Sequence, residues 1–251
     1  MDYQHKYHKY KLKYLELKKS QIGGNNKKNL VLITSVINIV KTPFNVGVRS
    51  VYSQQDRFDQ TLYTIKSIKN YIPNPYIVLL EGSDLTKEQI DKINEVGCDQ
   101  IYMVSKNIRE HIDGPCKSVG ELYILLDYLN NLKNVNEYET ISKISGRYYL
   151  NDKFDWNKYP IDKAIYHCNK VRNNMTHYNT RYYRIPVKYY DLYKDILNKC
   201  LSDKDILSCK SYIELYNIFQ IFPDKLEINK EKGEILGVEG NMGRSGINVV
   251  D

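Results

Sequence analysis

The sequence predicts an α/β fold: a single domain in which a mixed, mostly parallel β-sheet is flanked by helices. Short apolar runs alternate with amphipathic segments between residues 30 and 150 of the 251-residue chain. Each apolar run closes on a short polar cluster, which is typical of strands that end at the edge of an open sheet. No long Pro/Gly/Ser-rich stretch follows residue 30, so we expect one domain with elaborations.

Strands in the first half are predicted from runs of apolar and β-branched residues. The run at 30–40 is apolar enough for a buried parallel strand, and further strands are expected at 76–80, 101–104 and 140–150. The connection 41–59 is longer than usual between a strand and a helix, so we expect it to contribute to a site.

Helices between these strands follow from spacing and from start signals. One contains Leu62, Ile65, Ile68 and Ile72 and stops at the Pro-Asn-Pro of 73–75. The next begins at Thr86, whose capping box is completed by Gln89, and ends at Gly97. The clearest helix is predicted to begin at Ser118, with Glu121 as its capping-box partner.

Beyond residue 150 the pattern is looser. Strands are expected around 164–168 and 180–185, and helices at 187–200 and 211–222. The tail at 237–246 is expected to be a glycine-rich loop. Asp203-Lys204-Asp205 is expected to be a solvated turn between late helices.

Residues 1–28 are expected to be a basic leader with a flexible joint, and residues 29–251 the folded domain. Tyr or Leu at positions 3, 7, 10, 14 and 17 predicts an amphipathic helix with lysines on its other face. The leader holds eight lysines against Asp2 and Glu16, so it carries +6 of the formal +7 and leaves +1 on the rest. A nearly neutral body argues against a nucleic-acid enzyme.

The composition and the length of the apolar stretches argue against several classes of protein. No apolar stretch reaches the roughly 18 residues that a membrane span needs, and the first residues contain no apolar signal region. Five cysteines without a CxxC pair favour a reducing compartment without structural zinc. We therefore expect a soluble protein that is not secreted.

Candidate site residues are sought where strands end, because ligands of open α/β sheets sit beyond the carboxyl ends of the strands. The first two strands end in Thr34, Ser35, Glu81 and Ser83. Arg57, next to a helix start, is placed to bind a phosphate bidentately, and an ion pair with Asp56 or Asp59 is the alternative.

A second candidate is the start of the clearest helix. Lys117 and Ser118 lie where free backbone N–H groups and the helix dipole favour an anion, which makes this a natural diphosphate site. Glu121 is interpreted as structural. The fourth strand ends in Ser145-Gly146-Arg147, whose guanidinium is a third candidate phosphate ligand.

The order of these elements resembles glycosyltransferases of the A-type (GT-A) fold, in particular giant-virus sugar transferases and lipopolysaccharide-synthesis enzymes of the WavE kind. The resemblance covers most of residues 30–250. It implies that the nucleoside of a nucleotide sugar rests on Thr34, Ser35, Arg57, Glu81 and Ser83. For Glu81, an ordinary polar turn residue is the alternative interpretation.

The resemblance also has implications for a divalent metal ion and for the catalytic base. Members of this fold commonly hold Mg²⁺ or Mn²⁺ with an Asp-x-Asp element at the fourth strand end, where this chain has Ser145-Gly146-Arg147. Metal-independent chemistry with Arg147 replacing the cation is one expectation, and a metal held by Asp152 is the other. For the catalytic base, the resemblance points to a carboxylate in the second half, Glu214 first and Glu239 second.

The leader resembles the N-terminal segment of many mimivirus-like giant-virus proteins, which are also Tyr/Lys-rich and close on a Gln-x-Gly-Gly element. That resemblance spans about 20 residues. It implies a viral product made in the host cytoplasm, at the viral factory, or carried in the virion.

Together these features predict a glycosyltransferase that moves a sugar from a nucleoside diphosphate, UDP first, to a hydroxyl of a glycan or glycoprotein acceptor. A non-catalytic glycan-binding or virion-structural protein with the same fold is the alternative, favoured by the missing Asp-x-Asp. A third hypothesis is a protein that binds nucleic acid through the leader.

Overall fold

The structure is a computed structural model that describes residues 27–39, 50–114, 116–170, 176–208, 221–229, 232–242 and 245–250. It confirms an α/β fold built on a mixed, mostly parallel sheet of seven strands in the order β3-β2-β1-β4-β7-β6-β8. Only β7 runs against its neighbours in this sheet. The strands are β1 (Lys28–Ser35), β2 (Pro75–Glu81), β3 (Gln100–Met103), β4 (Tyr138–Ser145), β6 (Ala164–Lys170), β7 (Thr176–Pro186) and β8 (Lys225–Asn229).

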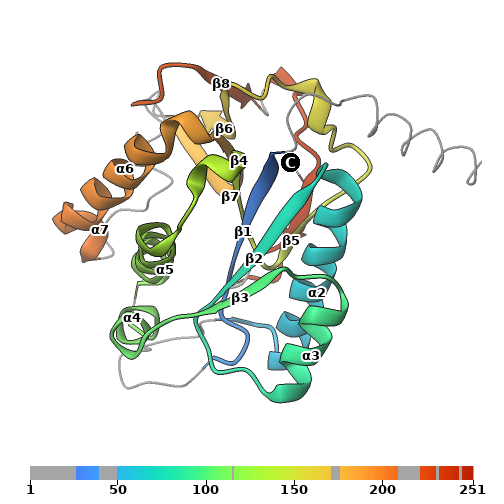
Figure 1. The fold of residues 1–251 in the computed structure, drawn as a ribbon, viewed down its shortest axis with the longest axis vertical. Coiled ribbons are helices and arrows are strands. Elements are labelled where there is room, and N and C mark those ends of the chain that lie inside the picture. The colour runs from blue at the N-terminus through green and yellow to red at the C-terminus, as the bar shows by residue number, and fades with distance from the viewer. Residues whose placement is uncertain are drawn as a thin grey trace, which may run out of the picture.

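Helices cover both faces of the sheet (Figure 1). One face carries α2 (Gln54–Tyr71) and α3 (Lys87–Glu95). The other carries α4 (Lys106–Ile112), α5 (Lys117–Asn131), α6 (Tyr190–Ser202) and the short α7 (Lys204–Leu207). Single 3-10 turns lie at Val135–Glu137, Trp156–Lys158 and Val187–Tyr189.

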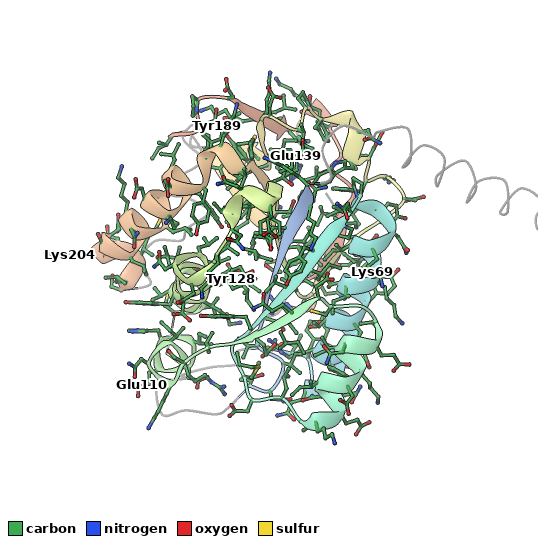
Figure 2. All side chains as sticks on the ribbon, in the orientation of Figure 1. Lys69, Glu110, Tyr128, Glu139, Tyr189 and Lys204 are labelled. Carbon is green, nitrogen blue, oxygen red and sulfur yellow. The ribbon has the colours of Figure 1, made fainter. Side chains whose placement is uncertain are left out.

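The alternating side chains of β1 show why the sheet is buried on both sides. Val31 and Ile33 pack with α2 in one hydrophobic cluster, while Leu30 and Leu32 pack with α5 in the other. Tyr128 of α5 belongs to the second cluster and is buried (Figure 2). The run of apolar residues that predicted this strand therefore fills two cores rather than one.

A second, three-stranded sheet lies beside α2, formed by β5 (Tyr148–Leu150), β9 (Val238–Asn241) and β10 (Asn248–Val250). Three hydroxyls of α2 hold β5: Thr61 donates to the Gly146 carbonyl, Thr64 donates to the Tyr148 carbonyl, and Ser67 accepts from the Leu150 amide. The predicted single strand at 140–150 is wrong, because the chain turns at Gly146 and Arg147. The prediction that 237–246 is a loop is wrong for its first part, which forms β9.

Helix starts were predicted with mixed success. The Thr86/Gln89 capping box of α3 is confirmed. The Ser118/Glu121 box is wrong: α5 begins at Lys117 with Cys116 at its N-cap, so Ser118 lies inside the first turn. The start of α2 has a capping box that sequence reasoning missed, formed by Ser53 and Asp56.

Three predictions fall wholly or largely outside the described residues: the leader helix, most of the helix at 211–222, and the first part of the long connection 41–59. Within the described chain, no helix combines the length and apolarity that crossing a bilayer requires. Asp203, expected in a solvated turn, ends α6 and accepts hydrogen bonds from the first amides of α7.

Candidate functional site

The sheet changes winding direction at β1. On one side β1 pairs with β2, which the chain reaches through α2; on the other it pairs with β4, which the chain reaches after α5 on the opposite face. Thr34 and Ser145 are register partners at the carboxyl ends of β1 and β4. The crevice outside such a switch point is where open α/β sheets bind ligands. The carboxyl end of β1 and the start of α2 lie in the lower part of Figure 1.

Five polar residues meet at this point, and we call them the rim cluster: Thr34, Glu121, Lys143, Ser145 and Arg147. Glu121 of α5 reaches across to both strands, since its Oε1 accepts from Thr34 Oγ1 at 2.6 Å and lies 2.5 Å from Lys143 Nζ. Ser145 Oγ lies 3.5 Å from the same oxygen. One carboxylate oxygen thus ties the ends of β1 and β4 to α5.

Lys143 is the buried member of the rim cluster. Its side chain is 1% exposed, against 23% for Glu121. Besides Glu121, its ammonium donates to Ser145 Oγ at 2.9 Å and to the Thr180 carbonyl at 2.7 Å. These three acceptors use all three of its protons, so Lys143 is placed to hold Glu121 rather than to meet a ligand.

The charge of Glu121 is set by its neighbours. Burial by itself raises the pKa of this carboxyl, but the Lys143 ammonium, the Thr34 hydroxyl and the Arg147 guanidinium together outweigh it and lower the pKa below 4.5. Glu121 is therefore ionised at neutral pH.

Arg147 lies at the turn between the two sheets. The Gly146 amide donates to the Thr34 carbonyl at 2.9 Å, which fixes the turn against the end of β1. A Cβ at Gly146 would lie 3.2 Å from Thr61 Oγ1 and 3.3 Å from Ser35 Cβ, so the turn packs closely against α2 and β1. The half-buried Arg147 has a buried Nε without a hydrogen-bond partner among the described residues.

Arg57 lies at the same end of the molecule, in the first turns of α2. Its Nε donates to the Val36 carbonyl at 2.7 Å, and its Nη2 contacts the same oxygen. The alternative ion pairs with Asp56 or Asp59 do not form: Asp56 caps α2, and Asp59 accepts from Gln55. Arg57 thus fastens the start of the loop after β1.

Glu81 and Ser83 fasten the same loop. Glu81 is fully buried, and its Oε1 accepts from the amides of Ile37 and Ser83 at 2.9 and 2.8 Å and from the Ser83 hydroxyl. Ser83 Oγ in turn accepts from the Asn38 amide at 2.9 Å. Burial raises the pKa of Glu81 against these hydrogen bonds. The Glu81 side chain is 0% exposed and these hydrogen bonds are all within the protein, so it shapes the loop after β1, and its contact with a nucleoside stays a prediction.

The remaining predicted ligand contacts, Ser35, Lys117 and Ser118, lie near the rim cluster. Ser35 Oγ is 3.4 Å from Thr61 Oγ1, directly beside the rim cluster. Lys117 and Ser118 are half-buried in the first turn of α5, and Lys117 lies one helical turn before Glu121 on the same face. The structure therefore brings Thr34, Ser35, Lys117, Ser118 and Arg147 to one end of the sheet.

Of the three predicted carboxylates, Asp152 lies away from this end, Glu239 lies on β9 beside β5, and Glu214 lies outside the described residues. Asp152 is exposed and contributes to the field at Tyr71, the last residue of α2, whereas the rim cluster is at the start of that helix. Glu239 pairs in register with Tyr149 and contacts Asn151 and Asn248 at 3.3 Å each, and the hydrogen bond with Tyr149 is the main cause of its lowered pKa. Glu214 falls within 209–220, which the structure does not describe.

A cavity of about 360 Å³ lies between α4, α5 and α7, lined by Glu110, Cys116, Val119, Tyr123, Leu207 and neighbours. Val119 and Tyr123 are each two residues from Glu121, so they lie on the opposite face of α5 from it. Glu110 is seen on the outer side of α4 (Figure 2). This cavity is separate from the rim cluster.

Sequence reasoning missed Lys143 and Ser145 and misassigned Glu121. One signal was available: Lys143 lies in the middle of the strand Tyr138–Ser145, between Ser142 and Ile144, whereas the strand's other charged residue, Glu139, lies near its start. A lysine in a central strand needs a buried partner, and that requirement points to a polar site.

No group of three or more His, Cys, Asp or Glu side chains gathers as a metal site in the described part of the chain. Comparison of the sequence with known protein families and with curated proteins finds no match.

Proposed function

We propose that this protein is a glycosyltransferase that moves a sugar from a nucleoside diphosphate sugar to a hydroxyl of a glycan or glycoprotein. The observation that carries the proposal is the rim cluster itself, a charged and hydroxyl-bearing group at the switch point between β1 and β4. The order of elements, which resembles A-type glycosyltransferases, supports the same function.

Breaking a bond between a sugar and a diphosphate leaves negative charge on the phosphate oxygens, which fixed cations stabilise. Arg147 is the first candidate for this role, because its buried Nε still lacks a partner among the described residues. Lys117 approaches the same end from the first turn of α5, where the helix dipole adds to its charge. In this proposal Arg57 acts indirectly, by holding the loop after β1.

We propose that these cations replace a divalent metal. Mg²⁺ and Mn²⁺ prefer several oxygen ligands with carboxylates among them. Glu121 is the one carboxylate of the rim cluster, and Lys143 already occupies its Oε1. An ammonium ion at that position repels a divalent cation, which favours chemistry in which Arg147 and Lys117 stabilise the diphosphate without a metal.

The acceptor hydroxyl must lose its proton, and if the reaction inverts the sugar a carboxylate takes it. Glu214 and Glu239 remain the candidates for this step. Glu239 is two residues along the β5–β9 pair from Arg147, and its hydrogen bonds with Tyr149, Asn151 and Asn248 make it the weaker of the two.

The test is turnover. The purified protein is incubated with a panel of nucleoside diphosphate sugars, with Mn²⁺ or with EDTA, and nucleotide release is measured. Release should occur and should survive EDTA. Arg147→Ala should lower it about 10- to 100-fold, because charge-assisted hydrogen bonds to phosphate are lost.

Lys66→Ala is the matched control, since it removes one positive charge from an exposed position on α2. Its release should equal that of the wild type. Absence of release together with absence of a thermal shift by UDP or GDP would instead support the non-catalytic glycan-binding or virion-structural protein.

A further inference from the structure

We propose that Glu121 is the specificity-determining residue of the rim cluster, where its free carboxylate oxygen binds a hydroxyl of the ligand's sugar moiety. The inference rests on the proposed function and extends it, because it says how a nucleotide sugar is told from a bare phosphate compound. The hydroxyl belongs either to the ribose or to the transferred sugar, and the experiment separates the two.

The two oxygens of Glu121 have different surroundings. Oε1 makes the contacts with Thr34, Lys143 and Ser145. No described residue hydrogen-bonds Oε2, and Oε2 is not among the buried unpaired atoms of the described chain. The 23% exposure of the side chain therefore includes Oε2, which faces outward at the end of the sheet.

This oxygen is an acceptor that is prepared for a hydroxyl donor. Lys143 and Thr34 fix the carboxylate in position and keep it ionised, so little ordering is needed when a ligand arrives. An ionised carboxylate accepts from hydroxyls but has no proton to donate to a phosphate oxygen. Such a group favours sugars and repels bare anions.

Arg147 completes the recognition pattern. It is close enough to lower the pKa of Glu121, yet the two side chains form no ion pair within 4.0 Å in the described structure. A ligand that carries a hydroxyl beside an anionic group satisfies both at once. Nucleoside diphosphates and their sugar conjugates have that chemistry, and inorganic pyrophosphate has only half of it.

The experiment measures binding by calorimetry with four probes: UDP, 2′,3′-dideoxy-UDP, UDP-glucose and inorganic pyrophosphate. GDP counterparts are used if the wild type prefers GDP. Glu121→Gln should lower the affinity for the hydroxyl-bearing ligand about 10- to 100-fold. The same change should leave pyrophosphate binding equal or tighter, because it removes a negative charge.

The pair Lys143→Met and Glu121→Gln/Lys143→Met repeats the comparison where the buried ammonium is absent, which guards against misfolding of the single variant. The double variant should again lose affinity for the sugar-bearing ligand relative to Lys143→Met. If affinity is lost for UDP but not for 2′,3′-dideoxy-UDP, the hydroxyl that Glu121 binds belongs to the ribose. If affinity is lost for UDP-glucose alone, it belongs to the transferred sugar.

Equal weakening of all four probes would show that Glu121 only supports the structure, and unchanged binding would show that Oε2 meets no ligand. Either result overturns this inference and leaves the proposed function standing. A wild-type protein that binds none of the UDP or GDP ligands would overturn both.

Discussion

Two glutamates near the carboxyl ends of the first strands have pKa values that are shifted in opposite directions. Glu81 is sealed inside with neutral donors, and burial raises its pKa, whereas Glu121 faces a lysine and an arginine that lower its pKa. The difference comes from their partners: neutral hydrogen bonds do not offset full burial, but a nearby ammonium does. Glu81 thus shapes the loop after β1, and Glu121 supplies charge to the site.

At Glu81 the raised pKa makes folding stability depend on pH. The folded protein keeps this proton above 4.5, where the unfolded chain has lost it, so stability falls as pH rises from about 4.5 through the folded pKa. Glu81→Gln keeps an oxygen for the three donors and cannot ionise. We expect the variant to gain stability over the wild type as pH rises from 4 to 8 in urea unfolding. Parallel curves for the two proteins would contradict the prediction.

The ion pair of Glu121 and Lys143 should respond unequally to the loss of each partner. Glu121→Gln leaves an ammonium at 1% exposure without its counter-ion and should cost about 3–5 kcal/mol. Lys143→Met leaves a carboxylate that water still reaches, so its cost should be smaller. The double variant should be more stable than Glu121→Gln alone. Denaturant midpoints of the four proteins test this, and equal costs for both single changes would contradict it.

At the scale of helices and strands, a sequence shows the signals that lie within a few residues of each other, but it does not show contacts between residues far apart in the chain. The α3 capping box lies within four residues and was predicted correctly. The start of α5 was misplaced because the helix begins after Cys116, whose side chain makes no capping hydrogen bond, so no capping residue in the sequence marks it. The strand at 140–150 was taken as continuous because the partners that turn it, Thr34 and Thr61, lie about 80 residues or more away.

The same limit applies to the candidate site. Strand ends predicted Thr34, Ser35 and Arg147 at one edge of the sheet, because that placement follows from parallel topology alone. The pairing of Glu121 with Lys143 joins α5 to the interior of β4, and no spacing rule in a single sequence reports such a contact. Glu121 was accordingly assigned to a cap that does not form.

The contact between β9 and the Arg147 turn offers an element-scale prediction. A Cβ at Gly240 would lie 2.3 Å from the Arg147 carbonyl oxygen, whereas one at Gly233 meets nothing within 4 Å. Gly240→Ala should therefore lower the free energy of unfolding by about 3 kcal/mol through overpacking. Gly233→Ala should cost about 1 kcal/mol, from its positive φ of 74° alone. Thermal unfolding compares them, and equal losses would contradict the assigned contact.

At the scale of the whole molecule, charge is concentrated at one end of the chain. Residues 1–26 contain six lysines against Asp2 and Glu16, a net +4 of the total +7. The rim cluster, by contrast, mixes both signs at one end of the sheet. Nonspecific attraction to polyanions and selection of a nucleotide sugar are therefore expected to reside in different parts of the chain.

Deletion of residues 1–26 tests that separation. The truncated protein should lose its salt-dependent binding to a DNA oligonucleotide while nucleotide release stays at the wild-type rate. Fluorescence anisotropy at several salt concentrations and the release assay measure the two properties. Tight DNA binding that persists without these residues would place the nucleic-acid surface on the folded body instead.

The turn at Gly146 and Arg147 belongs to both sheets, since it is bonded to the end of β1 on one side and abuts β9 on the other. A ligand that immobilises the guanidinium must also immobilise the C-terminal hairpin behind it. Backbone amides of β9, far along the chain from the residues of the rim cluster, should then exchange with deuterium more slowly when a ligand is bound at the rim cluster. The strand β9 would in that way report on events at the end of β1.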